Sequence, residues 1–452
     1  MITLRMKKLS VVLILAFQML LYSCASFNIE NHNFIKVTNS KFTLNNQPYY
    51  FLGTNLWYGA YLGSSGKTGN RKRLIKELDL LQELGVDNLR ILAASEKTEF
   101  RNSLSPAIQI QPNVYDEDIL IGLDFLLNEM RKRNMKAVLY LNNYWEWSGG
   151  MNQYNFWTNG ETVLPPKEDF DWGDFMRTSA TFYSNDSANV LYQNYIKKII
   201  TRKNSFNDHY YFEDPTIMAW QLANEPRPWG NENQIAYYYK WIDSTAKLIH
   251  KLDPNHLIST GSEGIVGSLM SEEIYKNAHS SKYIDYLTFH LWIKNWNWYD
   301  AKNPEKTYDS AKTKALNYIH AHLRLANELQ KPIVLEEFGI GRDYENFSPD
   351  SSVQYRDDYF ELIFKEILDS AAAGNPIAGS NFWGWGGFGK AANSDFIWKE
   401  GDDYTGDPPQ EPQGLNSVFA FDDSTINLIR LYAEKMKNIQ NQNMIKNETS
   451  AN

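Results

Sequence analysis

Short apolar runs alternate with longer amphipathic segments along most of the chain. The short runs are rich in β-branched and aromatic residues and end at turn-forming residues, which predicts buried strands. The longer segments repeat apolar positions every three or four residues, as a helix does when one face packs on a core. The expected strands cover residues 50–55, 86–92, 136–143, 216–224, 256–261, 284–290, 331–339 and 376–383. The expected helices cover residues 71–85, 116–134, 188–204, 232–253, 265–279, 309–330, 352–374 and 425–440.

This order of elements predicts the fold class. Eight strands that alternate with eight helices are typical of an α/β protein of the (β/α)8 TIM-barrel type, here with long βα loops. A doubly wound sheet is the main alternative, but it normally has a glycine-rich phosphate loop after an early strand, and none is present. Asn45-Asn46 predicts the turn of a short N-terminal hairpin. The barrel is expected to occupy residues 40–440, with a polar, disordered tail at 441–452.

The pattern of the N-terminal residues predicts an export signal. A basic "MKK" at residues 6–8 precedes the apolar stretch "LSVVLILAFQMLLY", which is shorter than the about 20 residues of a transmembrane helix. The stretch ends at "LYSCAS", which resembles the bacterial lipobox, and Cys24 is the only cysteine of the chain. We therefore expect removal of residues 1–23, lipidation of Cys24 and a tether at 24–39. An ordinary cleaved signal is the alternative. This predicts a protein of the bacterial cell envelope, anchored in the outer membrane on its surface or its periplasmic face.

Composition and charge narrow the class of ligand. The net charge of −9 and the isoelectric point of about 5.5 argue against nucleic acid as a partner. The chain has 14 Trp, 28 Tyr and 23 Phe, more aromatic side chains than the core of such a protein requires. Rings with apolar faces suit sugars. A single cysteine excludes an intrachain disulfide and a cysteine-based metal site. We expect no cofactor and no metal.

Polar side chains gather where the predicted strands end. Parallel strands of a barrel end at one face, and chemistry in such folds takes place there. Two carboxylates belong to this set, one after the fourth strand and one at the end of the seventh. The residues at these ends are Arg90, Asn143, Asn224, Glu225, His290, Glu337 and Trp383.

Two opposed carboxylates are what cleavage of a glycosidic bond needs. Glu337, hydrogen-bonded by Arg90, would stay ionised and act as the nucleophile. Glu225 would face that charge in a partly desolvated pocket, which should raise its pKa and make it the acid. Glu336 competes for the role of nucleophile. Successive side chains of a strand face opposite ways, so only one of the two glutamates is expected to enter the pocket.

The constellation resembles the family 5 glycoside hydrolases, and within them the endo-β-1,4-mannanases. "NEP" at 224–226 matches the family's acid/base pair, and "EFG" at 337–339 matches its nucleophile, which selects Glu337 over Glu336. "NNYWEWSGGMNQY" at 142–154 and "DPTIMAWQLANEPR" at 214–227 follow the mannanase order of loop and strand. One position departs from the pattern. The family usually has a tyrosine two residues after the strand-six histidine, and this chain has Trp292 there.

The resemblance implies retaining endo-hydrolysis of β-1,4-mannosidic linkages in mannan, galactomannan or glucomannan by a monomeric enzyme. A β-1,4-glucanase, an end-acting mannanase that releases mannobiose, and a non-catalytic glycan-binding lipoprotein are the alternatives. The resemblance assigns Glu225 as acid/base and Glu337 as nucleophile, with Arg90, Asn224, His290 and Trp292 in support. The residues expected to contact the β-mannan substrate are Trp57, Asn143, Trp145, Trp147, Arg227, Trp383 and Trp385.

Overall fold

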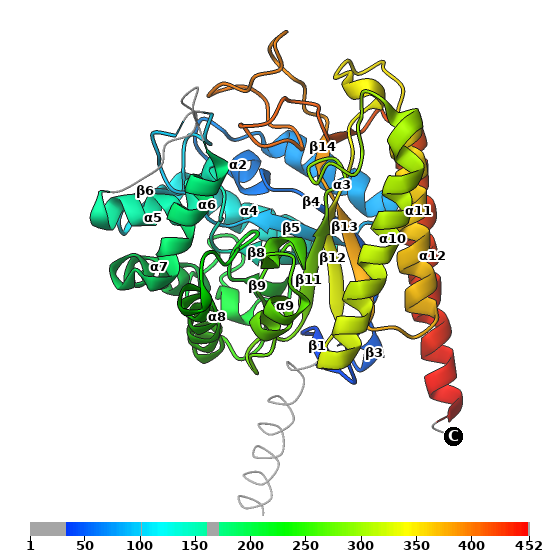
Figure 1. The fold of residues 1–452 in the computed structure, drawn as a ribbon, viewed down its shortest axis with the longest axis horizontal. Coiled ribbons are helices and arrows are strands. Elements are labelled where there is room, and N and C mark those ends of the chain that lie inside the picture. The colour runs from blue at the N-terminus through cyan, green and yellow to red at the C-terminus, as the bar shows by residue number, and fades with distance from the viewer. Residues whose placement is uncertain (1–32, 101, 161–170, 451–452) are drawn as a thin grey trace, which may run out of the picture.

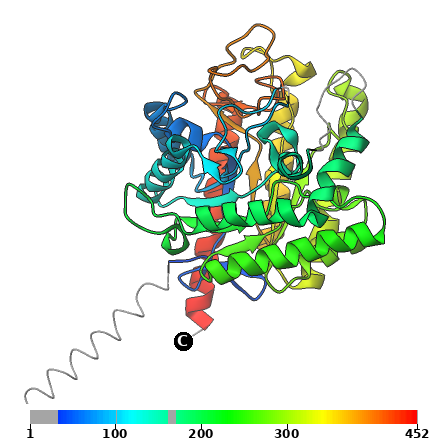
Figure 2. The same ribbon diagram turned by 90° about the vertical axis from the view of Figure 1, so that its left-hand side faces the viewer.

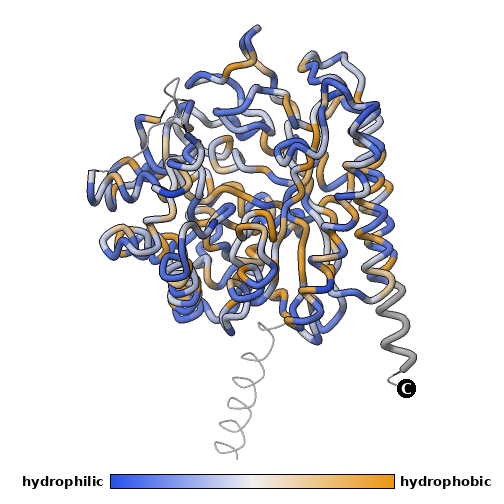
Figure 3. The backbone as a smooth tube through the Cα atoms, in the orientation of Figure 1, coloured by the Kyte–Doolittle hydropathy of each residue, from blue (hydrophilic) through white to orange (hydrophobic). Residues whose placement is uncertain are grey.

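Eight parallel strands form the centre of the molecule, as the apolar pattern predicts. The computed structural model describes residues 33–100, 102–160 and 171–450, and the predicted signal peptide and Cys24 lie outside the described residues. The strands of the barrel are buried along their whole length, apart from Lys136 at the start of one of them. Apolar positions accordingly concentrate in the middle of the fold (Figure 3). The barrel strands are β4 (Phe51–Asn55), β5 (Asn88–Leu92), β8 (Lys136–Tyr140), β9 (Ile217–Gln221), β10 (Leu257–Ser259), β11 (Leu287–Leu291), β12 (Ile333–Phe338) and β13 (Ile377–Phe382).

The sheet curls into a nearly closed barrel. Its strands follow the order β10-β9-β8-β5-β4-β13-β12-β11, all parallel where they pair. At the seam between β10 and β11, the backbone N–H of Asp285 donates to the carbonyl of Ile258 at 2.8 Å. This arrangement confirms the predicted (β/α)8 fold, in which residues from distant parts of the sequence meet at one end of the barrel.

Helices surround the barrel (Figures 1 and 2). Each predicted helix is present near its expected bounds, except that the one expected at 265–279 is shorter and the one expected at 425–440 is longer. None of the helices in the described ranges is both long and apolar enough to cross a lipid bilayer. The helices are α2 (Gly59–Gly63), α3 (Arg71–Leu84), α4 (Glu117–Lys132), α5 (Gly150–Asn159), α6 (Trp172–Ala180), α7 (Asp186–Ile200), α8 (Glu232–Leu252), α9 (Glu272–His279), α10 (Pro304–Leu329), α11 (Gln354–Ala372) and α12 (Asp423–Ser450).

A small antiparallel sheet closes the N-terminal end of the barrel. It consists of β1 (Lys36–Thr38), β2 (Lys41–Leu44) and β3 (Gln47–Pro48), with Asn45 and Asn46 in left-handed conformation at the predicted turn. Its apolar side chains pack under the strands, and the sheet itself lies at the bottom of the view in Figure 1. Packed together in this cluster are Ile35, Phe42, Tyr49, Val138, Met218, Tyr286 and Val334.

Two predicted boundaries differ from the structure. The tether was expected to reach residue 39, but β1 begins at Lys36 because its hairpin partner β2 pairs with it. The tail at 441–452 was expected to be disordered, whereas α12 continues to Ser450. Composition alone misses this continuation, because a polar segment can extend a helix whose earlier turns are already fixed by packing.

Long segments follow β8 and β13 on the opposite end of the barrel from the small sheet. The segment after β8 contains α5 and α6, and the segment after β13 contains β14 (Trp385–Gly387) and β15 (Val418–Phe419), which pair in parallel. The segment between β14 and β15 lies at the top of Figure 1. A further hairpin of β6 (Gln109–Gln111) and β7 (Val114–Tyr115) follows β5.

Candidate active site

A cavity of about 590 Å³ opens at the C-terminal ends of the barrel strands. It lies where the sequence predicts the chemistry, and both candidate glutamates line it. The segments after β8 and β13 supply much of its wall. Six of its lining residues are Trp145, Trp147, Asn224, Glu225, Glu337 and Trp383.

Glu225 and Glu337 approach each other across this cavity. Each contributes a carboxylate oxygen to a group, shared with His290, in which the polar atoms all lie within 4.8 Å of one another. Carboxyl groups of retaining glycosidases are about 5–5.5 Å apart, and those of inverting enzymes about 6.5–9.5 Å. The spacing therefore fits direct attack by one carboxylate and leaves too little room for the water of an inverting reaction.

A strained backbone position helps to bring Glu225 into the cavity. β9 ends at Gln221, and Glu225 has a φ of 49°, a left-handed conformation that is uncommon for a residue with a side chain. Such strain persists only where surrounding contacts fix it, and it concentrates at functional sites. Here the backbone N–H of Glu225 donates to the carbonyl of Gly261 at 2.9 Å. The break in the strand lets Asn224 and Glu225, adjacent in sequence, both line the cavity.

Arg90 connects the nucleophile to the floor of the site. Its side chain is fully buried and donates from Nη1 to Oε1 of Glu337 and from Nη2 to Oδ1 of Asn224 at 2.7 Å. Further hydrogen bonds run to Asn55 at 3.1 Å and to Gln221 at 2.8 Å. Asn55 and Gln221 have no counterpart among the predicted site residues, although both lie at or near strand ends. The guanidinium thus places a fixed positive charge beside the carboxylate that must remain ionised.

A β-bulge explains how both glutamates of "EEF" approach Arg90. The pairing of β11 with β12 shifts after Phe289, so that His290 stands opposite Glu337 and Glu336 has no partner. Glu336 accepts hydrogen bonds from Gln221 at 2.6 Å and lies 3.7 Å from Arg90 Nε, in the barrel interior. The simple alternation of a strand fails at this position. Of the two glutamates, Glu337 is the one that lines the cavity.

His290 changes the predicted charge of Glu225. Burial raises the pKa of Glu225, but the hydrogen bond from His290 Nδ1 to Oε1 at 2.6 Å and the charges of His290 and Arg227 outweigh it and hold the pKa at about 2. Burial lowers the pKa of His290, whereas the charge of Glu337 and the bond to Glu225 raise it to about 9. The expectation of a raised pKa for Glu225 omitted this cation, which favours the ionised carboxylate. The pair holds one proton at neutral pH, on the imidazole.

Two tryptophans donate to the carboxylates. Trp292 Nε1 lies 3.2 Å from Oε2 of Glu337, so an indole donates from the position where a tyrosine is usual. Trp145 Nε1 donates to Oε2 of Glu225 at 2.6 Å. Trp147 also lines the cavity and packs edge-on against Trp57. Both candidate tryptophans of the segment after β8 therefore face the site, in different roles.

A second ionic cluster borders Glu225. Arg227 pairs with Glu263, stacks over the Trp145 ring at 4.8 Å and has Nη2 3.9 Å from Oε2 of Glu225. Trp296 Nε1 donates to Glu263 at 3.0 Å. Burial raises the pKa of Glu263 to about 7, against the lowering effect of Arg227. The sequence prediction missed Glu263, although it follows the fifth strand and could have been found by the same strand-end rule.

Three predicted substrate contacts do not line the cavity. Trp57 is 1% exposed, and its Nε1 donates to the carbonyl of Gly406 at 3.1 Å, so the segment after β13 covers it. Trp385 is fully buried because it belongs to β14, which pairs with β15. Asn143 accepts a hydrogen bond from Asn224 Nδ2 at 3.2 Å and positions that residue instead. Trp383, which directly follows β13, does line the cavity.

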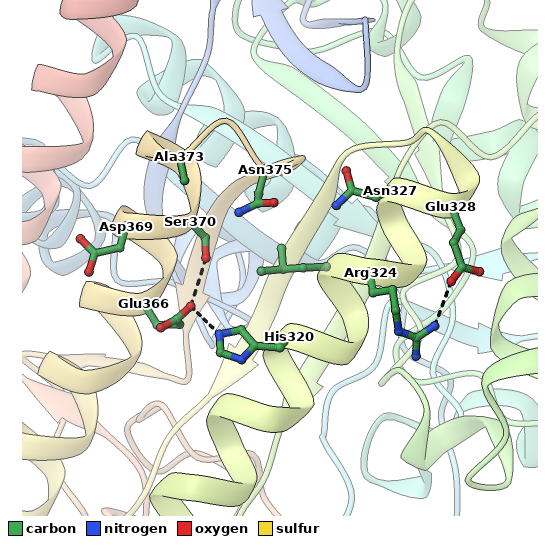
Figure 4. Close-up of a pocket in the computed structure, with 10 residues that line it drawn as sticks. His320, Arg324, Asn327, Glu328, Glu366, Asp369, Ser370, Ala373 and Asn375 are labelled. Carbon is green, nitrogen blue, oxygen red and sulfur yellow. Dashed lines mark hydrogen bonds and ion pairs between the residues drawn. The ribbon is translucent and has the colours of Figure 1, made fainter.

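Another cavity, of about 760 Å³, lies on the outside of the barrel between α10 and α11 (Figure 4). Most of its charged groups pair within the lining itself. His320 Nε2 lies 2.9 Å from Glu366 Oε1, and Arg324 donates to Glu328 at 2.9 Å. It shares no residue with the strand ends, so the chemistry is assigned to the cavity around Glu225 and Glu337.

Comparisons with known proteins agree with this geometry. Residues 32–441 match a family described as GH family 5 beta-mannosidase-like. The chain is 30% identical to mannan endo-1,4-beta-mannosidase 7 of Arabidopsis thaliana over 77% of each chain. It is 27% identical to mannan endo-1,4-beta-mannosidase 4 of Solanum lycopersicum, over 78% of this chain and 83% of that one. The crystal structure of a glycoside hydrolase family 5 mannosidase from Rhizomucor miehei is 34% identical, with a TM-score of 0.84, covering 91% of this chain and 99% of that one. A variant of that mannosidase has been solved in complex with mannosyl-fructose.

Proposed function

The chain belongs to the GH family 5 beta-mannosidase-like family, and from this premise we propose that it hydrolyses β-1,4-mannosidic linkages in mannan, galactomannan or glucomannan. The observation that carries the proposal is the approach of Glu225 and Glu337 to within 4.8 Å in a cavity walled by tryptophans. The names of the plant relatives support mannan as the polymer.

The reaction is a double displacement. Glu337 attacks the anomeric carbon as the bond to the departing sugar oxygen breaks, and that oxygen takes the proton held by the Glu225–His290 pair. The proton reaches Glu225 along the 2.6 Å contact with the imidazole. A water molecule then attacks the glycosyl ester of Glu337 while Glu225 accepts its proton. The two inversions retain the anomeric configuration. Asn224, fixed by Arg90 and Asn143, is placed to donate to the sugar 2-hydroxyl.

Internal cleavage of the polymer is the activity that the names of the plant relatives support. Cleavage near a chain end is the second candidate. It is favoured by the 34% identical mannosidase and by a wall of residues 408–411 that borders the cavity. Product analysis on linear mannan separates the two, because internal cleavage yields long oligomers early and cleavage near the end yields short sugars from the start.

The activity itself is tested with Glu337→Ala. This variant should lose turnover on β-mannan while it remains folded, as its circular dichroism spectrum would show. Retained wild-type rates would refute the assignment of the nucleophile. A parallel assay on carboxymethylcellulose tests the β-1,4-glucanase alternative, because galactomannan should be cleaved and carboxymethylcellulose should not. Binding to insoluble mannan without release of reducing sugar would support a non-catalytic glycan-binding protein instead.

We further propose that the mature protein is a monomer anchored in the outer membrane of a bacterium by lipid on Cys24. The lipobox-like sequence supports the anchor, and the position of the small N-terminal sheet supports an orientation. β1–β3 cover the end of the barrel that lies opposite the cavity (Figure 1). A chain anchored in the membrane at Cys24 therefore joins the fold at the end of the barrel that this sheet closes. The cavity would face away from the bilayer, toward the polysaccharide.

A further inference from the structure

The segment "GDPPQEPQG" at residues 406–414 forms a stiff wall beside the catalytic cavity. It lies between β14 and β15, and its residues Pro408, Gln410 and Glu411 line the cavity. Three prolines restrict its backbone. Asp407 accepts hydrogen bonds from the backbone N–H of Gly414 at 2.9 Å and of Asn416 at 2.7 Å.

One glutamine ties the turn of this segment together. Nε2 of Gln413 donates to the carbonyls of Asp407, Pro408 and Glu411, each at 3.1 Å. Oε1 of Gln413 accepts from Thr405 at 2.7 Å. The backbone that carries Gln410 and Glu411 is therefore held in place before any ligand binds.

Two polar atoms of this wall are buried and unpaired. Oε2 of Glu411 and Oε1 of Gln410 have no hydrogen-bond partner within the part of the chain that the structure describes. Burial and the charge of Asp407 raise the pKa of Glu411 to about 8, with a further contribution from Glu337, while Lys294 and a hydrogen bond from Asn416 lower it less. A buried polar atom without a partner is costly, and such an atom at the wall of a cavity is a candidate for contact with a ligand. The hydroxyl groups of a sugar are suitable partners.

The position of Glu411 relative to the barrel strands indicates which part of the substrate it borders. Glu225 protonates the departing oxygen, so the leaving part of the substrate lies on the side of Glu225, Arg227 and Glu263, above β9 and β10. The wall follows β13 and covers Trp57, which follows β4. β4 and β13 are neighbours on the far side of the barrel from β9 and β10. Glu411 therefore borders the glycone side, where the sugar to be transferred to Glu337 is bound.

We propose that Gln410 and Glu411 bind hydroxyls of the sugar at the non-reducing end and close the glycone side after one or two mannosyl units. Short β-1,4-linked manno-oligosaccharides, or the non-reducing ends of longer chains, are then the preferred substrates. This inference rests on the proposed function and specifies its substrate class.

The experiment uses mannopentaose that carries a fluorophore at its reducing end. In the wild type the first labelled products should be tetraose and triose, because one or two sugars are removed from the other end. Glu411→Ala should lower kcat/KM for mannotriose about 5- to 100-fold, because a sugar hydroxyl bound by Glu411 is then buried without a partner. Its labelled products from mannopentaose should become shorter. Glu411→Gln, which keeps the shape, should show a smaller change in the same direction.

Glu400→Gln is the matched control, because this exposed carboxylate lies between β14 and β15 but outside the catalytic cavity, where it accepts from Ser105 Oγ at 2.7 Å. Glu400→Gln should leave unchanged both kcat/KM for mannotriose and the labelled products of mannopentaose. Two results would overturn the inference: early labelled products of all lengths from the wild type, or an unchanged set of labelled products in a folded Glu411→Ala or Glu411→Gln protein. In either case hydrolysis of mannan would still support the proposed function. No hydrolysis of any β-mannoside by the wild type would refute both.

Discussion

Trp292 donates its indole N–H to Oε2 of Glu337 across 3.2 Å. The same oxygen lies 3.2 Å from His290 Nδ1, while Arg90 donates to the other oxygen. Glu337 is thus held by two hydrogen-bond donors, Arg90 and Trp292, and by the nearby charge of His290. The tryptophan stands where the resembling family has a tyrosine hydroxyl. An indole donates and does not accept, so its contact with an ionised carboxylate is as suitable as that of a hydroxyl.

Trp292→Phe should therefore lower kcat about 10- to 100-fold, because a hydrogen bond to a charged group contributes about 1.5–3 kcal/mol. Trp292→Tyr should recover part of this loss, since its hydroxyl offers a donor. Steady-state rates on mannohexaose measure the loss in Trp292→Phe and the recovery in Trp292→Tyr. A Phe variant as active as the wild type would show that this contact does not support the nucleophile.

Glu225→Ala should lose the contribution of general acid catalysis, about 10²–10⁴-fold in kcat/KM on mannan oligosaccharides. The loss should be smaller on an aryl β-mannoside with an acidic leaving group, because such a group departs without a proton. The ratio of the two losses is the measurement. Equal losses on both substrates would contradict the acid role of Glu225.

The Glu225–His290 pair makes a prediction about pH. In the wild type the pair keeps its proton until the pH approaches the pKa of His290, about 9. In His290→Gln the proton must reside on Glu225, whose pKa rises because burial is then opposed by fewer positive groups. A lone carboxyl still releases its proton at lower pH than this imidazole does. The alkaline limb of kcat/KM should move to lower pH. His320→Gln, an exposed histidine paired with Glu366, serves as control.

The alkaline limb of kcat/KM could instead stay in place in His290→Gln and be normal in His320→Gln. That result would show that the His290 imidazole does not hold the catalytic proton.

Arg90 should also be important for stability. Arg90→Met leaves Glu336 and Glu337 buried without their cation, and removal of one partner from a buried ion pair costs about 3–5 kcal/mol. Arg324→Met removes a half-exposed arginine that pairs with Glu272 and Glu328, and should cost about 0–1 kcal/mol. Unfolding in urea at pH 7 measures both. Similar free energies of unfolding for the two variants would contradict the account of the buried network.

The pattern of apolar residues predicts the barrel well because each barrel strand is buried along almost its whole length. The rule that strands end at a common face then identifies Arg90, Glu225, His290 and Glu337. It fails where long segments fold back over the site. The cover on Trp57 and the burial of Trp385 depend on residues 388–420, whose path has no periodic signal. The charge of Glu225 depends on a through-space neighbour 65 positions away.

The predicted lipid anchor has a direct test in a bacterial host. Cys24→Ser should move the protein from the membrane fraction to the soluble fraction and abolish labelling with a palmitate analogue. A variant that still sediments with membranes and is extracted only by detergent would contradict anchoring through Cys24.

Orientation can then be tested on the lipidated protein. Asn33 follows Cys24 by nine positions (33 minus 24), and a stretch of that length spans at most about 30 Å. If Cys24 is lipidated, we expect the barrel to stay near the bilayer, with the end closed by β1–β3 facing the lipid. Since the cavity opens at the other end, vesicle-bound enzyme should cleave soluble galactomannan with the same kcat/KM, relative to mannotriose, as the Cys24→Ser protein. A selective loss on the polymer at the vesicle surface would mean that the cavity faces the membrane.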